Sequence, residues 1–191
     1  MNKIKFGTKI IYHGEPYTCL KSEFIKPGKG KPFIRLLIKS LVSEKTLEKT
    51  FKSIESIDVT DDISEIKLTY IYNNTQFWFF MKEEGYDQFH IAKDNLGDKI
   101  DWMTNHLKCD VIFWKDRLIS VKLPNFVFLK VIKVVNQKQS SDSSFGGKKG
   151  WKQVMLQTGA IIKVPYFIKV GDIIKINTKK RSYESREKIN T

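Results

Sequence analysis

The segment Lys9–Ile25, KIIYHGEPYTCLKSEFI, contains two extended apolar runs separated by His13-Gly14-Glu15-Pro16. Short runs of β-branched and aromatic residues are typical of strands, and Gly and Pro mark turns, so this segment predicts a strand, a turn and a second strand. The following segment, PFIRLLIKSLVSEKTLEKTFK at 32–52, contains two more such runs with Ser43-Glu44-Lys45 between them. Residues 1–64 are therefore predicted to form a small all-β domain.

The middle of the chain, residues 65–128, shows a second β pattern with a single helix. IKLTYIYNNTQFWFFM at 66–81 predicts two aromatic-rich strands joined by a hairpin turn at Asn73-Asn74. In the segment 92–107, AKDNLGDKIDWMTNHL, the apolar residues at helical spacing are Leu96, Ile100, Met103 and Leu107. Gly97 interrupts this segment, so we expect only a short helix before the chain returns to strands.

The last part of the chain, residues 129–191, again predicts short strands. Residues 136–153, NQKQSSDSSFGGKKGWKQ, are rich in Ser, Gly and Lys and predict a flexible loop. The segment 154–178 then predicts three strands, separated at Thr158-Gly159, Pro165 and Gly171-Asp172. Many short strands with a lone helix favour an all-β chain of three small β-barrels, with domain divisions after residues 64 and 128.

Composition and charge indicate the kind of partner. The 191 residues are 41% hydrophobic and 13% aromatic, which is enough to build packed cores. The formal net charge of +13 and the pI near 9.6 favour a polyanionic partner. The excess is concentrated in residues 129–191, which contain 14 Lys and Arg against 4 Asp and Glu.

The sequence also predicts a compartment. No apolar run approaches the roughly 20 residues of a membrane helix, and the basic start lacks the apolar region of a secretory signal. Cys19 and Cys109 are far apart and form no metal or redox motif, so we expect buried thiols in a reducing environment. A soluble cytoplasmic protein is predicted.

The motifs of enzymes are missing from the sequence. His13, His90 and His106 have no Cys or carboxylate at ligand spacing, so neither a metal site nor another cofactor is expected. Nucleophile-elbow, zinc-protease and phosphate-loop patterns do not occur, and GKGK and GGKKG resemble the last of these in composition alone. The sequence predicts that the protein is not an enzyme.

Two groups of residues are candidates for nucleic-acid contact. The aromatic residues Tyr70, Tyr72 and 77–80 could stack bases, but no Lys or Arg interleaves them, so packing of alternate members in a core is favoured. The basic runs Lys148-Lys149 with Lys152 and Lys179-Lys180-Arg181 are either a solvated surface or phosphate contacts. The charge of their domain favours phosphate contact, and a single-stranded nucleic-acid-binding protein remains an alternative function.

The connector FIKPGKGKPF at 24–33 lies between two predicted strands and contains Lys26, Lys29 and Lys31. Pro27 suits the first central position of a turn, and Gly28 the positive φ that we expect at the next position. With Gly30 on its other side, Lys29 is predicted at the apex. Spacing alone favours an ordinary solvated hairpin, although a tip that holds Lys29 against a partner is also compatible.

Four segments resemble the bacterial translation elongation factor P family, in order and at the family's spacing. They are SEFIKPGKGKPFIRLLIKSL with EKTFKS (22–53), LTYIYNNTQFWFFM (68–81), ISVKLPNFVFLKV (119–131) and LQTGAIIKVPYFIKVGDIIKINTKKRSYESR (156–186). The first is similar to the family pattern KPGKGxAFxRxKxxN…EKTFKS. The resemblance covers nearly the whole chain, and its separated motifs make a chance match negligible.

This resemblance implies an L-shaped molecule with an SH3-like, KOW-type N-terminal barrel followed by two OB-fold barrels. It implies a monomeric elongation factor that binds the 70S ribosome between the P and E sites. Such a factor stimulates peptide-bond formation where ribosomes stall on consecutive prolines. The implied partners are ribosomal RNA and the peptidyl-tRNA in the P site, without a membrane and without catalytic residues.

The resemblance also implies site residues. Lys29 matches the family's loop-tip lysine, which reaches the CCA end of the P-site tRNA and which a lysine-modifying enzyme extends in many members. The tip residues expected at the CCA end are Lys26, Pro27, Gly28, Lys29, Gly30 and Lys31. Tyr183 and Arg186 are retained from the family's terminal pattern TRTGEYxSR and are expected to contact RNA from the third domain.

Departures from the family pattern lie in the third domain and directly before it. The family's GDTA-like loop near the E-site codon is replaced by SSDSSFGGKKGW, whose expected codon-side residues are Asp142, Ser143, Gly146, Gly147 and Lys148. Arg181 replaces a glycine and Ser182 an acidic residue, and both changes add positive charge. Phe128 stands where an acidic residue is common in the family.

Overall fold

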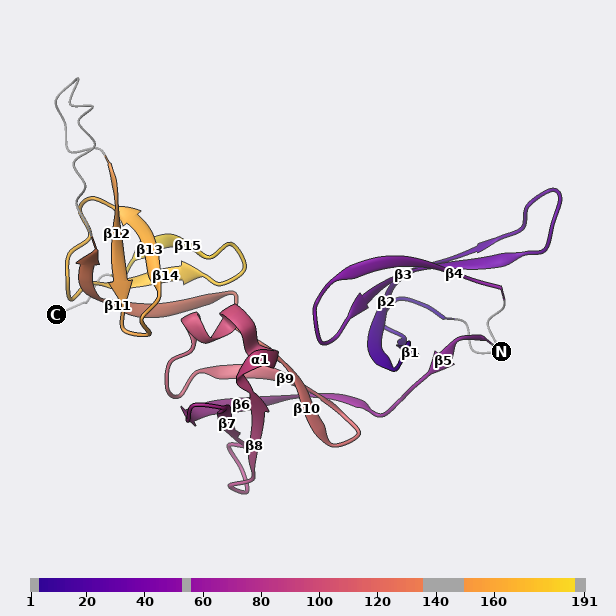
Figure 1. Cartoon of the computed structure of the whole chain (residues 1–191), viewed down its shortest axis with the longest axis horizontal. Helices are drawn as coiled ribbons and strands as arrows, with labels where there is room; N and C mark the ends of the chain where they lie inside the picture. Colours follow the sequence, from indigo (N-terminus) through magenta and orange to yellow (C-terminus); the bar gives the residue numbers. More distant parts are fainter. Residues whose placement is uncertain (1–3, 53–55, 136–149, 188–191) are drawn as a thin grey trace. The chain divides into compact units, whose positions relative to one another are not determined.

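The computed structural model describes residues 4–52, 56–135 and 150–187. Within these residues the chain forms three curled, five-stranded sheets and one short helical segment (Figure 1). No helix in this part of the chain is long and apolar enough to cross a membrane. The sheets confirm the predicted all-β fold class with a lone short helix.

The N-terminal sheet has the strand order β4-β3-β2-β1-β5, and all of its neighbouring strands pair antiparallel. Its strands are β1 (Lys9–Tyr12), β2 (Glu15–Ile25), β3 (Phe33–Ser40), β4 (Thr46–Phe51) and β5 (Asp58–Val59). His13 and Gly14 have φ values of 50° and 76°, so β1 and β2 are joined by a two-residue hairpin turn with positive φ at both positions. The predicted turn is in the right place, but Glu15 and Pro16 belong to β2.

Alternation along β3 explains how this sheet holds together. Ile34, Leu36 and Ile38 are buried in one core cluster with Ile10 and Cys19 from the neighbouring strands. Successive side chains of a strand point to opposite faces, so every second residue of β3 enters the core. The buried face anchors the long β2–β3 hairpin from which the connector 26–32 extends.

The middle sheet has the order β10-β9-β6-β7-β8. Its strands are β6 (Ile63–Asn73), β7 (Phe77–Met81), β8 (Gln88–Ala92), β9 (Lys108–Trp114) and β10 (Arg117–Lys122). Within the segment 92–107 the short helix consists of one α turn, α1 (Lys93–Leu96), followed by a 3-10 segment, η2 (Gly97–Trp102). Gly97 has φ 54°, which is outside the right-handed helical region and ends the α-helix there.

The aromatic run of the middle sheet divides between the two faces of β6 and β7. Tyr70, Trp78 and Phe80 are buried, which confirms core packing for alternate members of the run. Tyr72 and Phe79 lie opposite each other on the other face, where their rings stack with centroids 4.6 Å apart. The prediction that alternate members of the run fill a core is therefore confirmed.

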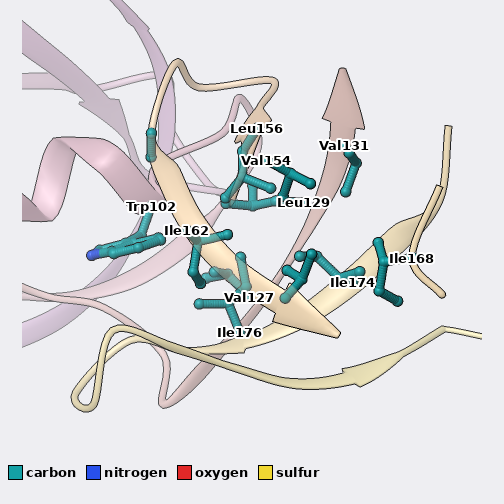
Figure 2. Packing of buried hydrophobic residues seen from close by; sticks show 12 residues of the cluster. Trp102, Val127, Leu129, Val131, Val154, Leu156, Ile162, Ile168, Ile174 and Ile176 are labelled. Atoms are coloured by element: carbon teal, nitrogen blue, oxygen red, sulfur yellow. The ribbon is translucent and has the colours of Figure 1, made fainter. Parts of the chain in front are cut away.

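The third sheet has the order β13-β12-β11-β14-β15, again with antiparallel neighbours. Its strands are β11 (Phe126–Val135), β12 (Trp151–Leu156), β13 (Ile161–Pro165), β14 (Ile173–Asn177) and β15 (Ser182–Arg186). Leu129, Leu156 and Ile174 from three of these strands point into one apolar cluster, at whose edge lies Trp102 of η2 (Figure 2). The loop predicted over 136–153 is too long, since Trp151–Gln153 belong to β12.

Both cysteines are free and buried, as predicted. Burial raises the pKa of the Cys19 thiol, and burial together with the nearby Asp110 carboxylate raises the pKa of Cys109 to about 12. Since the thiolate is the reactive form, neither side chain is a nucleophile at neutral pH.

Candidate functional site

The β2–β3 hairpin positions the predicted loop tip. Its ladder continues to the pair Ile25 and Phe33, so residues 26–32 are held at both ends by the last strand pair. Next to the connector Phe24 is exposed, whereas its ladder partner Ile34 still belongs to the core cluster and anchors the end of the hairpin. The connector is thus a protruding tip on a fixed stem.

The backbone of this tip differs from the predicted turn. Gly30 has φ 110°, whereas Gly28 is not in the positive-φ region, so the glycine that supplies the unusual conformation follows Lys29 instead of preceding it. A Cβ added to Gly28 would meet no atom within 4 Å, and one added to Gly30 would lie 3.7 Å from Pro27 Cγ. The prediction that Gly28 adopts positive φ is therefore wrong, and Gly30 takes that role.

The three lysines of the tip have different surroundings. Lys26 Nζ lies 5.7 Å from the centroid of the Phe24 ring, which keeps this cation close to the hairpin. Lys29 and Lys31 are exposed, and within the described ranges neither makes an ion pair or a hydrogen bond. Lys29 is therefore available to an external partner.

Cations nearer the body of the sheet are paired. Lys21 Nζ lies 2.5 Å from Glu23 Oε1, and Arg35 Nε lies 3.5 Å from Glu48 Oε1. Their charges are largely compensated, so the net positive charge of the hairpin is located at its tip. This distribution suits attraction of a polyanion to the tip.

The third-domain candidates, Tyr183 and Arg186, both lie on β15. Tyr183 is half-buried with its ring edge-on to Trp151 at 6.3 Å, and burial is the main cause that raises the pKa of its phenol. Arg186 is exposed, with its Nη1 3.8 Å from Asp172 Oδ2 and its guanidinium 5.8 Å from the centroid of the Phe167 ring. Arg186 is therefore more accessible to a partner than Tyr183.

The other basic candidates of this domain are described in part. The predicted codon-side residues Asp142, Ser143, Gly146, Gly147 and Lys148 lie outside the described residues, as does Lys149. Lys152 Nζ lies 5.1 Å from the centroid of the Tyr166 ring, and Lys179 and Lys180 are exposed at the β14–β15 turn.

Arg181 has a role that sequence reasoning missed. Its Nη1 lies 2.7 Å from Asp98 Oδ2, so it is engaged in an ion pair in addition to carrying positive charge. Its φ is 53°, a conformation that favours glycine, and the family pattern has glycine at this position. The replacement of the family's glycine at this position could have indicated an unusual backbone conformation. The ion pair could not be predicted, because Asp98 is distant in sequence.

Metal-ligating residues do not converge in the described ranges, where no group of three or more His, Cys, Asp or Glu could hold an ion. His13, His90 and His106 lie on different segments, and His90 packs edge-on against Phe77 at 5.0 Å. What the described residues offer is a cationic tip and a basic third domain.

Comparison with protein-family models identifies the chain. The KOW-like domain of elongation factor P matches residues 1–57, its OB domain matches residues 63–121, and its C-terminal domain matches residues 129–186. The chain belongs to the elongation factor P family. As a member of the elongation factor P family it is a translation elongation factor that interacts with the ribosome and is not a conventional enzyme.

Two solved structures show a partial likeness to this elongation factor P family member. Eukaryotic translation initiation factor 5A from Methanococcus jannaschii is 15% identical with a TM-score of 0.45, covering 62% of this chain and 88% of that chain. A translation initiation factor eIF-5A family protein from Naegleria fowleri is 14% identical with a TM-score of 0.45, covering 62% of this chain and 92% of that chain.

Proposed function

We propose that this protein binds the ribosome between the P and E sites and stimulates peptide-bond formation at polyproline stalls by placing Lys29 against the CCA end of the P-site tRNA. The observation that supports this role is the exposed, unpaired Lys29 on a tip whose strands are fixed by the Ile25–Phe33 pair. Membership of a translation factor family supports the ribosome as the setting.

The proposed mechanism needs no acid, base or nucleophile from the protein. Proline is a poor nucleophile, and its tRNA holds the reacting groups in unproductive geometries. A long cation against the tRNA backbone would order the CCA end and lower the entropic part of the barrier. Good positioning contributes up to roughly 7–11 kcal/mol in favourable intramolecular reactions.

The neighbours of Lys29 have supporting roles in this proposal. Lys31 adds unpaired positive charge, and Lys26 adds charge from beside Phe24. Pro27 and Gly30 set the backbone, while the small Gly28 leaves open space beside the apex. The same openness would admit a lysine-modifying enzyme, whose added group would extend the reach of the Lys29 amine.

Tyr183 and Arg186 complete the proposed contacts from the third domain. Arg186 would bind RNA phosphate through its exposed guanidinium, since arginine forms directional hydrogen bonds to phosphate. Tyr183 would contribute mainly by supporting the strand end, because it is half-buried against Trp151.

The experiment is a polyproline reporter translated by purified ribosomes with added factor. Lys29→Ala should abolish the stimulation while the free energy of unfolding stays unchanged, because the side chain is exposed and unpaired. Lys45→Ala, which removes an exposed lysine from the β3–β4 turn of the same sheet, is the matched control and should retain stimulation. Full stimulation by the Lys29→Ala protein would exclude the proposed mechanism.

Binding measurements separate this function from the alternative of a general single-strand-binding protein. The proposed factor should bind ribosomes more tightly than free single-stranded RNA at the same salt concentration. The reverse order of affinities would favour the alternative, because general single-strand binders need no ribosome.

A further inference from the structure

The third sheet has an exposed aromatic face that the proposed function does not use. Along β11, Val127 and Leu129 enter the core, while Phe126 and Phe128 lie on the opposite face and are 37% and 50% exposed. Because side chains alternate along a strand, the two rings are neighbours on one surface about 7 Å apart along the chain. Large apolar groups that gather on a surface are a mark of interaction sites.

Cations lie beside both rings. Lys175 on β14 is directly opposite Phe128 in the ladder, and its Nζ lies 4.3 Å from the centroid of the Phe126 ring. Lys130 follows Phe128 on the same face of β11 and is exposed. Ser185 on β15 lies opposite Lys175 and offers a hydroxyl. Within the described ranges, neither lysine side chain makes an ion pair.

We propose that this face, formed by Phe126, Phe128, Lys130, Lys175 and Ser185, binds an unpaired segment of RNA. The open ring of Phe128 would stack on a base, and the ammonium groups of Lys130 and Lys175 would contact the flanking phosphates. Sheets that bind single strands combine these two elements, aromatic platforms for bases and cations along the backbone.

The positive charge of the third domain favours RNA over a second copy of the chain as the group that binds this face. Residues 129–191 contain 14 Lys and Arg against 4 Asp and Glu, so a polyanion is attracted to the whole domain. A second copy of the chain would bring two such domains together, and like charges across an interface are unfavourable. The proposal concerns a different domain from Lys29 and does not depend on the mechanism at the loop tip.

The test measures binding of the full-length protein to two fluorescent probes. One is an oligouridylate of about 12 nucleotides, and the other is the same ribose-phosphate chain without bases. Stacking on one aromatic ring is worth about 1–3 kcal/mol, so Phe128→Ala should weaken oligouridylate binding by roughly 5- to 150-fold. It should leave the abasic probe unaffected, since that probe has no base to stack.

Two further variants complete the design. Tyr86→Ala removes a ring that is 84% exposed in the middle domain, and it should leave binding of both probes unchanged. Lys175→Ala should weaken the binding of both probes. It should also reduce the slope of log K against the logarithm of the salt concentration by about 0.7, the contribution of one phosphate contact on a single strand. Lys45→Ala, which removes an exposed lysine of the β3–β4 turn, should bind both probes normally. These measurements use no ribosomes, so their outcome is independent of the polyproline reporter.

A cross-linking experiment checks the location directly. An oligonucleotide containing 4-thiouridine should cross-link to the peptide that includes 126–130 on irradiation. Cross-links confined to other peptides, or equal losses for Phe128→Ala and Tyr86→Ala, would overturn the proposal. So would a dimer that Phe128→Ala dissociates in sedimentation equilibrium without a change in RNA binding, because the occupant would then be a second copy.

Discussion

Replacement of Gly30 by alanine changes the backbone preference of the loop tip and leaves its charge unchanged. Gly30 has φ 110°, and an added Cβ would lie 3.7 Å from Pro27 Cγ, which is an ordinary van der Waals contact. The cost of Gly30→Ala therefore comes from the backbone and not from a clash. A non-glycine residue held in such a region costs about 1–3 kcal/mol, which reduces the population of the native tip conformation roughly 5- to 150-fold.

The location of the tip determines which measurement shows this cost. Residues 28–31 are exposed, so the chain can relieve the strain by changing the connector without unfolding the sheet. We expect the free energy of unfolding in urea to fall by less than about 1 kcal/mol. Stimulation of the polyproline reporter at limiting factor concentration should fall at least fivefold, because fewer molecules present Lys29 correctly.

Gly28→Ala is the matched control for this experiment. Gly28 is outside the positive-φ region, and a Cβ at this position meets no atom within 4 Å. This variant should therefore stimulate the reporter as the unchanged protein does. Equal activity of the two alanine variants, whether both high or both low, would refute the inference that Gly30 sets the presentation of Lys29.

Four other predictions concern stability and reactivity. Leu129 is fully buried, so Leu129→Ala should lower the free energy of unfolding by about 2–5 kcal/mol in a urea titration. Ile161 is 52% exposed, so Ile161→Ala should change the same quantity by less than about 0.5 kcal/mol. Neither Cys19 nor Cys109 should react with a thiol reagent in the native protein at neutral pH, and both should react in denaturant. Because the pKa of Cys109 is raised in the fold, the free energy of unfolding should fall as pH rises from 9.0 to about 12. In this range the thiol of the unfolded chain ionises while the thiol of the folded protein stays neutral. Arg181→Gly should be more stable than Arg181→Ala by about 1 kcal/mol, because φ is 53° there; equal stability in thermal melts would contradict this reasoning.

Local sequence rules were sufficient for most of the fold. The turn at His13-Gly14 and the buried alternation of Ile34, Leu36 and Ile38 follow from residue types and a period of two. The same period places Phe126 and Phe128 on one face of β11. These features depend on neighbours in sequence, so they are visible without a structure.

The features that could not be predicted depend on residues that are distant in sequence. Two glycines flank Lys29, and which of them takes positive φ depends on how the paired strands end at Ile25 and Phe33. The ion pair of Arg181 requires Asp98 from another segment, and no local pattern indicates it. Likewise, Lys175 lies beside Phe126 because of the register between β11 and β14, which their separate sequences do not determine.

Burial of both cysteines makes the protein suitable for chemical substitution at the loop tip. The chain contains 2 cysteines, and neither is accessible in the fold, so a thiol introduced by Lys29→Cys would be the single reactive one. Alkylation with bromoethylamine would convert it into a thioether analogue of lysine, and longer haloalkylamines would extend the amine step by step. The reach that the tRNA end requires could then be measured as a function of side-chain length, without the enzyme that modifies lysine.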